Sequence, residues 1–300
     1  METAVFGNIK ERVTETVTAN GVPSVTVTGV YPFDAEATFT CGQCFRFDDD
    51  GDGAYEGVAM GKRIRVSTPN EDTAIIDGIT KDEYERVWRR YLGLDIDYAA
   101  IINNVRDTYG AESRIAVAAN AGRGIRILRQ DRWEALCSFI ISQNNNIPRI
   151  KTIIERVCKE LGEPAEGGGY AFPTAEVIAA AGAEGLAFSR MGFRAKYVAA
   201  AAKTVCDDID FLDRVEEAPY DEADAMLRSL HGVGPKVSSC ALLFGFSRLE
   251  AFPVDVWIRR TVGKYFDGDP SHLDFGALAP YAGILQQYIF HYERNIEGAS

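Results

Sequence analysis

The chain has 300 residues, of which 46% are apolar and 25% charged, and its formal net charge is −12. This length suffices for two or three domains, each with its own core. The acidic balance argues against general attraction to nucleic acids, because polyanions repel such a chain. The sequence shows neither an apolar run long enough to span a membrane nor a secretory signal pattern, so we expect a protein of the cell interior, in the cytoplasm and without membrane partners.

The first hundred residues are predicted to form strands and a helix. The segments 24–30 and 62–68 alternate and are rich in Val, Ile and Thr, while the DGDG run at 50–53 and Gly61 mark turns. The run DDDGDG resembles part of a calcium loop, but its twelfth position is Ala59 instead of an acidic ligand. We therefore expect a hairpin turn there, followed by a helix over 81–92.

The six cysteines are scattered along the chain, and free buried thiols are their expected state in a reducing compartment. Cys41 and Cys44 form a C-x-x-C pair, which is typical of zinc or redox sites. No second pair and no nearby histidine pair completes a ligand set. We therefore predict that the protein has no metal site.

From about residue 113 the pattern becomes helical. In the segment 146–162, apolar residues follow the i, i+3, i+4, i+7 rule, with Pro148 in the first turn and Gly162 at the C-terminal cap. Further helices are predicted over 174–181, 195–207, 221–230, 235–246 and 275–292. The segment 113–154 also carries seven basic and two acidic residues, which indicate either a local positive surface or a solvated helix face.

A glycine-rich turn joins two of these helices over 221–246, in the sequence LHGVGPKVSSC. Glycines permit positive φ and close backbone approach, and Pro235 suits the first helical position. The open amide groups of Gly232, Val233 and Gly234 and of the following helix can hold one phosphate. The alternative is a tight helical connection without a ligand.

Lys236 lies in the first turn of the second helix, where the helix dipole disfavours an ammonium and favours the neutral, nucleophilic amine. Cys240 follows one turn later on the same face. Asp255, in the segment FPVDVW, can supply a carboxylate that stabilises a sugar cation while the amine captures it as a Schiff base. A structural salt bridge between Lys236 and Asp255 is the alternative.

Six motifs in one order make the chain resemble the 8-oxoguanine DNA glycosylases of the helix-hairpin-helix (HhH-GPD) superfamily, and bacterial or archaeal members in particular. They are CGQCFRF (41–47), SQNNNIPRI (142–150), GFRAKYVAAAA (192–202), LHGVGPKVSSC (230–240), FPVDVW (252–257) and PYAGILQQYIF (280–290). The resemblance implies a bifunctional glycosylase and AP lyase that flips 8-oxoguanine from duplex DNA, preferably opposite cytosine, with Lys236 as nucleophile and Asp255 as its electrostatic partner.

The resemblance also implies a role for each pocket residue. The carbonyl of Gly42 would accept the N7 proton that marks oxidised guanine, Cys240 and Phe290 would sandwich the base, and Gln286 would read its Watson–Crick edge. Four residues would fill the hole and contact the orphaned cytosine: Asn144, Arg149, Phe193 and Arg194. The chain departs from the animal enzymes at Phe193, where they have a tyrosine, and at Trp257, where they have a histidine.

These observations predict an α+β fold. Residues 1–112 would form an α+β domain with a TBP-like antiparallel sheet, and 113–300 a helical HhH-GPD region with two subdomains and the hairpin at 221–246. We expect double-stranded DNA carrying 8-oxoguanine as the partner and a monomeric, prokaryotic enzyme. We expect neither an iron–sulfur cluster nor another cofactor, while the hairpin turn could hold a structural monovalent cation. The alternatives are an alkylpurine glycosylase of the same fold and a non-catalytic helix-hairpin-helix module.

Overall fold

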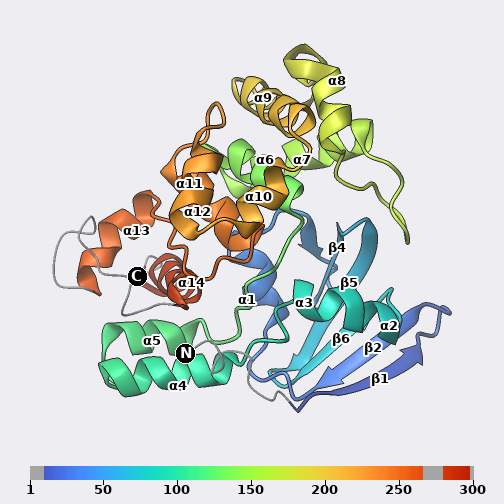
Figure 1. Cartoon of the computed structure of the whole chain (residues 1–300). Coiled ribbons are helices and arrows are strands. Elements are labelled where there is room, and N and C mark those ends of the chain that lie inside the picture. Colours follow the sequence, from blue (N-terminus) through green and yellow to red (C-terminus); the bar gives the residue numbers. More distant parts are fainter. Residues whose placement is uncertain (1–9, 266–279, 298–300) are drawn as a thin grey trace.

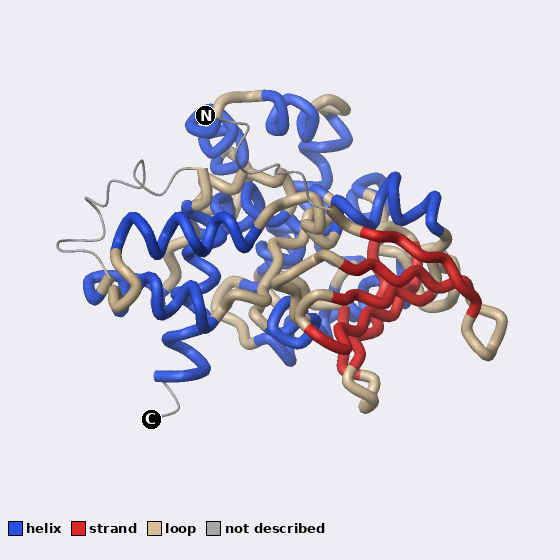
Figure 2. Tube along the Cα trace, turned by 90° about the horizontal axis from the view of Figure 1, so that it is seen from below, coloured by secondary structure: helices blue, strands red, loops and turns tan. Residues whose placement is uncertain are grey.

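The computed structural model describes residues 10–265 and 280–297. A six-stranded antiparallel sheet forms one side of the molecule and helices form the rest (Figures 1 and 2). The strand order is β1-β2-β6-β5-β4-β3. The strands are β1 (Arg12–Val17), β2 (Pro23–Thr28), β3 (Phe47–Asp49), β4 (Ala54–Ala59), β5 (Lys62–Asn70) and β6 (Thr73–Asp77). The predicted α+β class is confirmed.

The sheet forms because alternate residues of its strands are apolar and face one core. In β2, Val25 and Val27 are buried and lie opposite Ile76 and Ala74 of β6. The acidic run is a hairpin turn between β3 and β4, as predicted. The Asp50 carboxylate accepts hydrogen bonds there from the amides at positions 52 and 54.

Helices pack against this sheet, and further helices follow them in the chain. Helix α1 (Ala35–Thr40) lies beside β3, β4 and β5. The predicted helix over 81–92 is present as three consecutive segments with a π-helical middle, which are α2 (Lys81–Glu83), η2 (Tyr84–Trp88) and α3 (Arg89–Tyr91). The sequence prediction missed α1 and also α4 (Tyr98–Tyr109), whose N-cap Asp97 accepts from the amide of Ala100 at 2.9 Å.

The remaining helices enclose a second, larger apolar core. They are α5 (Arg114–Ala121), α6 (Arg132–Ser142), α7 (Ile147–Leu161), α8 (Ala175–Gly185), η3 (Ala187–Ser189), α9 (Arg194–Asp207), α10 (Phe211–Glu217), α11 (Tyr220–Arg228), α12 (Pro235–Phe244), α13 (Val256–Thr261), η4 (Val262–Lys264), α14 (Ala282–Tyr292) and η7 (Glu293–Glu297). Six of them match the segments predicted individually, which are α7, α8, α9, α11, α12 and α14. The predicted start of the last long helix, at 275, lies outside the described residues.

An extended segment, 124–130, joins the two cores. Ile127 belongs to the helical core and the next residue, Leu128, to the core under the sheet. Arg126 lies between Ile125 and Ile127 in this segment, and its side chain is almost completely buried. It donates to the carbonyls of Val30, Gly93 and Ile96 and lies over the Tyr98 ring, 4.3 Å from the ring centroid.

The boundary at residue 112 remains a prediction. Helix α4 packs against α5, and its buried residues belong to the helical core. Helix α14 also packs against α5, so the last long helix of the described chain lies beside a helix that comes much earlier in the sequence (Figure 1). None of the helices within the described ranges is long and apolar enough to cross a membrane.

Candidate active site

The predicted helix-hairpin-helix is present, with α11 and α12 joined by residues 229–234. Gly232 has φ = +85°, and a Cβ there would lie 2.2 Å from the Tyr197 ring of α9. A glycine is therefore required both by the backbone conformation and by the packed ring. Ser238 of α12 donates to the Asp224 carboxylate of α11 at 2.7 Å, which fixes the two helices to each other.

The second glycine of the turn has a different environment. Gly234 is the N-cap of α12, Pro235 occupies the first turn, and a Cβ at Gly234 would meet no heavy atom within 4 Å. The amide of Val233 already donates to the carbonyl of Leu230 at 3.0 Å. The open face of the turn therefore lies at Gly234 and the first turn of α12, where backbone amides can approach an anion.

Lys236 is half-buried at the base of this helix. Its Nζ lies 3.3 Å from the Oγ of Ser142 and 5.3 Å from the centroid of the Phe139 ring. The Ser142 hydroxyl donates its only proton to the carbonyl of Phe139 at 2.8 Å. Ser142 can therefore only accept from Lys236, and this contact orients one N–H of the amine. Sequence reasoning did not single out Ser142, because its contact with Lys236 joins residues 94 positions apart.

Asp255 lies across the same cavity, which has a volume of 650 Å³. Its carboxylate accepts a hydrogen bond from the amide of Ile258 at 2.8 Å and so caps the start of α13. Within the described residues no ion pair joins Asp255 to Lys236. The alternative of a structural salt bridge between them is therefore not supported, and both groups face open space in the cavity.

The cavity is bordered by two further segments. Asn144, from the loop after α6, lines it opposite α12. Trp257, 48% exposed, lines it on α13 together with Arg259 and Arg260. The cavity therefore combines a lysine, a carboxylate, a large exposed aromatic ring and two cations.

The four residues predicted to hold the base come from three elements. Cys240 is buried one turn beyond Lys236, and burial raises the pKa of its thiol, although the neighbouring lysine opposes that shift. Gly42 has φ = +88° and lies next to the Ile147 side chain. Gln286 is buried on α14, and Phe290 packs half-buried against the helical core. Of the four, none is among the residues that line the cavity of Lys236 and Asp255.

Gln286 has a buried amide neighbour. The Gln287 side chain donates to the Oε1 of Gln286 at 2.9 Å, while the Oε1 of Gln287 is buried without a partner. An unpaired buried carbonyl is costly. Two adjacent glutamine amides on α14 therefore retain hydrogen-bonding capacity in the core.

The residues predicted to contact the opposite strand lie in the loop after α6, in the first turn of α7 and at the start of α9. Asn144 is exposed with φ = +48°. Phe193 is 50% exposed and packs edge-on against Tyr197. Arg149 is exposed, and its Nη2 lies 3.5 Å from the carbonyl of Arg190. Exposed aromatic and cationic groups are thus brought together at this edge.

Arg194 differs from its neighbours because it is only 4% exposed. Its Nε and Nη2 donate to the carbonyl of Gln143, its Nη2 also to that of Asn144 at 2.9 Å, and its Nη1 to that of Met191 at 3.1 Å. Its guanidinium also lies 4.5 Å from the centroid of the Phe193 ring. Burial, and then the nearby charge of Arg149, lower the pKa of Arg194. Three of these four contacts, those to Gln143 and Asn144, hold the loop that carries Asn144.

The seven basic residues of 113–154 do not form a positive surface, and the reading as a solvated helix face is also wrong. Five of them form ion pairs and Arg126 is buried, so only Arg149 is exposed without an acidic partner among the described residues. The ion pairs are Arg114–Glu293, Arg123–Glu71, Arg129–Asp95, Arg132–Asp213 and Lys151–Asp48. These cations bind distant acidic residues of the same chain.

The C-x-x-C cysteines are buried thiols. Burial raises the pKa of Cys41 to about 12 and that of Cys44 further, so both side chains are neutral thiols. Across the described ranges, no group of three or more His, Cys, Asp and Glu side chains is arranged to hold a metal ion.

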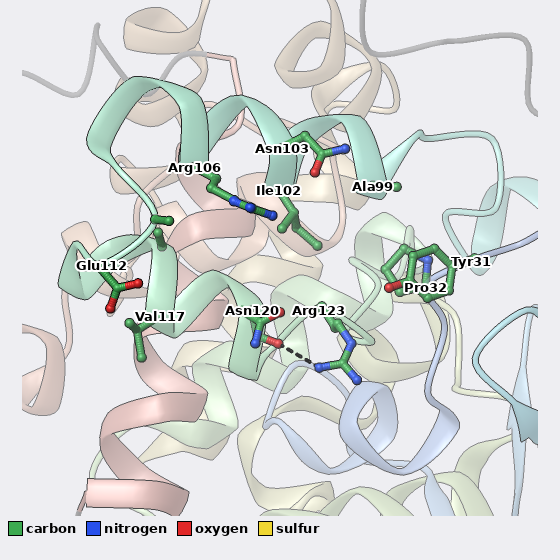
Figure 3. Close-up of a pocket in the computed structure, with 12 residues that line it drawn as sticks. Tyr31, Pro32, Ala99, Ile102, Asn103, Arg106, Glu112, Val117, Asn120 and Arg123 are labelled. Carbon is green, nitrogen blue, oxygen red and sulfur yellow. Dashed lines mark hydrogen bonds between the residues drawn. The ribbon is translucent and has the colours of Figure 1, made fainter.

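A separate hollow of 430 Å³ lies between α4 and α5 (Figure 3). Ile102 and Arg106 of α4 line it from one side and Val117 of α5 from the other. At its end Arg123 donates to the carbonyl of Asn120 at 3.3 Å. None of the predicted site residues borders this hollow, so the cavity beside the hairpin is the candidate active site.

The chain is similar to known DNA repair proteins. Residues 26–136 match the model of the 8-oxoguanine DNA glycosylase N-terminal domain, and residues 137–272 match that of the HhH-GPD superfamily of base excision DNA repair proteins. A probable N-glycosylase/DNA lyase from Methanothermobacter thermautotrophicus is 30% identical over 220 residues, which are 62% of this chain and 69% of that protein.

Two solved structures share the whole fold. MBOgg1 in complex with a low-affinity DNA ligand superimposes with a TM-score of 0.87 at 37% identity, covering 96% of this chain and 99% of the other. The 8-oxoguanine glycosylase/lyase of Clostridium acetobutylicum, in complex with double-stranded DNA containing cytosine opposite 8-oxoG, gives 0.86 at 31% identity with the same coverage. The chain belongs to the 8-oxoguanine DNA glycosylase family of the HhH-GPD superfamily.

Proposed function

We propose that this protein is a bifunctional glycosylase and AP lyase that removes 8-oxoguanine from duplex DNA. The observation that carries the proposal is the pairing of Lys236 and Asp255 across one cavity beside an anion-accepting hairpin turn. One relative is named a probable N-glycosylase/DNA lyase, and a second, an 8-oxoguanine glycosylase/lyase, is solved in complex with double-stranded DNA containing cytosine opposite 8-oxoG.

In the proposed reaction, the neutral Nζ of Lys236 attacks C1′ of the flipped nucleotide. The C1′–N9 bond breaks as the N–C1′ bond forms, and its electron pair leaves with the base, which takes up a proton. The Asp255 carboxylate stabilises the positive charge that develops on the sugar. Ser142 orients the amine for attack through its accepted hydrogen bond.

The covalent sugar then opens to a Schiff base between Nζ and C1′. Loss of a proton from C2′ allows β-elimination, in which the C3′–O bond breaks and the 3′ phosphate departs with the electron pair. Hydrolysis of the imine returns Lys236 to its amine form. The lysine is thus required for both base removal and strand cleavage.

The base pocket is proposed to consist of Gly42, Cys240, Gln286 and Phe290. The Gly42 carbonyl would accept the N7 proton that 8-oxoguanine has and guanine lacks. A buried carbonyl left unpaired by guanine would cost about 1–3 kcal/mol. The partly satisfied glutamine pair on α14 supports this reading, because Gln286 and Gln287 retain unused hydrogen-bonding groups.

The opposite strand is proposed to be held by Asn144, Arg149, Phe193 and Arg194. The exposed Phe193 ring is suited to insertion between stacked bases, and Arg149 has unused donors for the O2 and N3 acceptors of cytosine. Arg194 would act by holding the Asn144 loop, with one N–H of its guanidinium left for a base.

Double-stranded DNA is the proposed partner. One phosphate would lie on the turn at Gly232, Val233 and Gly234, with Gly234 as its most open point. We further propose that the protein works as a monomer in the prokaryotic cytoplasm, associated with the nucleoid. Catalysis by the lysine needs no cofactor, and a monovalent cation at the turn would be structural.

Borohydride trapping tests the proposal. Duplexes carrying 8-oxoguanine, an alkylated base or no lesion are incubated with enzyme and reductant, and the covalent adduct is resolved by electrophoresis. We expect an adduct only with 8-oxoguanine, absent in Lys236→Gln and retained in Lys203→Gln, an exposed lysine on α9 paired with Asp207. Release of an alkylated base without any adduct would identify the alkylpurine alternative, because that reaction uses the carboxylate and water. Binding without release would identify a non-catalytic module.

A further inference from the structure

Three arginines beside the active-site cavity have no acidic partner. They are Arg149 and Arg156 of α7 and Arg190, which follows η3. Within the described ranges, no carboxylate lies at ion-pair distance from any of them, whereas five of the basic residues in 113–154 are paired. In a chain of net charge −12, such an unpaired group of cations is unexpected.

The three arginines line a single hollow of 430 Å³, which we call the arginine hollow. Its other lining residues come from the first two turns of α7 and from the residue before it, and none of them is acidic. They are Asn146, Pro148, Thr152 and Ile153. The hollow therefore concentrates positive charge without internal neutralisation.

Backbone contacts hold the guanidinium groups in place. The Nη2 of Arg149 lies 3.5 Å from the carbonyl of Arg190, and the Nη1 of Arg156 lies 3.5 Å from that of Ser189. Arg190 itself is in the left-handed region, with φ = +60°. Most N–H groups of the three guanidiniums have no acceptor, so they can form bidentate contacts with an anion.

The hollow adjoins the residues proposed to contact the opposite strand. Arg149 belongs to both groups, Asn146 is the N-cap of α7 in the loop that carries Asn144, and Arg190 precedes Phe193 by three residues. Burial first, and then the charge of Arg149, lower the pKa of Arg194. The unpaired cations of the hollow therefore lie next to the residues proposed to contact the opposite strand.

We propose that the arginine hollow binds a backbone phosphate of the strand opposite the lesion. This inference rests on the proposed function only in that the ligand is duplex DNA. A phosphate group offers several oxygen atoms that accept hydrogen bonds, and their arrangement matches the planar donors of a guanidinium group. Arg156 and Arg190 would supply affinity that does not depend on base sequence, while Arg149 reaches towards the orphaned base.

Salt-dependent binding tests the proposal. Anisotropy titrations would use a labelled duplex with a reduced abasic analogue opposite cytosine, and an undamaged duplex, at several KCl concentrations. Each neutralised phosphate contributes about 0.9 to the slope of log K against log salt. The double variant Arg156→Ala/Arg190→Ala should lower this slope by about 1 on both duplexes and weaken binding about tenfold at low salt.

A matched control separates this effect from a change in net charge. Arg86→Ala removes one exposed cation that is paired with Asp82 on the sheet side of the molecule, and its slope should equal that of the wild type. Arg190→Ala alone changes one exposed side chain and should give about half of the effect, even where the double variant is less stable. Equal slopes in all four proteins would overturn the proposal.

Neutral methylphosphonate linkages locate the contact. Placed one at a time in the strand opposite the lesion, they should weaken wild-type binding at one position and leave the double variant unaffected at that position. Equal sensitivity of both proteins at every linkage would contradict the assignment. If inorganic phosphate competes with duplex better than chloride at equal ionic strength, through the same arginines and without linkage sensitivity, the hollow binds free phosphate and the DNA assignment is wrong.

Failure of the proposed chemistry is distinguishable from failure of this inference. A wild-type protein that gives no borohydride adduct but shows the slope change still has a phosphate site in the arginine hollow. A protein that gives the adduct without the slope change has the proposed activity and lacks this contact.

Discussion

Arg149 and Arg194 lie next to each other but should affect opposite-base preference differently. Arg149 is exposed and has unused donors, so Arg149→Ala should remove a contact to cytosine that adenine cannot replace. A lost base contact costs about 1–3 kcal/mol, or roughly tenfold to a hundredfold. We expect the ratio of excision rates, 8-oxoguanine opposite cytosine over adenine, to fall by that factor.

Arg194→Met should instead slow both pairs alike. The side chain donates to the carbonyls of Gln143, Asn144 and Met191, and hydrogen bonds from a charged donor contribute about 1.5–3 kcal/mol each. Water can reach part of this loop after the substitution, so we expect a net loss on the order of 2–4 kcal/mol in holding the loop. The effect acts through the positions of Asn144 and Phe193, so it should be nearly the same whether cytosine or adenine lies opposite the lesion.

Single-turnover excision on the two duplexes, with enzyme in excess, measures both effects. Thermal unfolding of each variant checks that the fold is retained. If Arg194→Met lowers the cytosine-to-adenine ratio of excision rates as much as Arg149→Ala does, the two arginines do not have these different roles. Equal rates for the two pairs in the unmodified protein would remove the opposite-base role from Arg149.

The other predictions concern the nucleophile and a buried carboxyl. Lys236→Gln should abolish trapping while lesion binding persists, and trapping at the wild-type level would exclude that lysine. Asp255→Asn should raise the activation barrier by about 3 kcal/mol or more and so slow turnover over a hundredfold, since a charge facing the sugar cation is lost. A decrease in turnover of less than tenfold would contradict this. Ser142→Ala should slow excision about threefold to tenfold while trapping still occurs, and an unchanged rate–pH profile would argue against its positioning role. Burial raises the pKa of Glu134 from 4.5 to about 7 in the folded protein, despite the Arg46 ion pair. The folded state therefore binds the proton more tightly than the unfolded state, and the free energy of unfolding should fall by about 2–3 kcal/mol between pH 5 and pH 8. Urea unfolding of Glu134→Gln at these two pH values should show a smaller fall in this free energy, and a fall equal to that of the wild type would refute this cause.

Local sequence chemistry predicted the hairpin between α11 and α12 well. The glycines, Pro235 and Lys236 lie within one short segment, and turn and cap preferences are properties of neighbouring residues. The acidic turn after β3 was predicted for the same reason. Helix α4 was missed because its Ile, Asn and Thr residues have modest helix propensity, and packing against α5 stabilises it.

Charge was the least predictable property. The basic run of 113–154 was interpreted by its own composition, whereas its partners, such as Glu71 and Glu293, lie far away in the sequence. The same limitation hid Ser142 and the holding role of Arg194, because both depend on which loop faces which helix. Pairwise contacts over long sequence separation are set by the tertiary fold, which one sequence does not display.

The buried guanidinium of Arg126 has a consequence for how the molecule comes apart. It has no carboxylate to neutralise it among the described residues, and it is held by carbonyls from the loop after β2 and from the turn before α4. Separating the sheet from the helices would break these hydrogen bonds and leave the guanidinium partly buried without acceptors, which costs several kcal/mol. The two cores should therefore unfold in one calorimetric transition, and neither half should fold by itself when it is cut from the chain. The sheet and the helices would then behave as one cooperative unit.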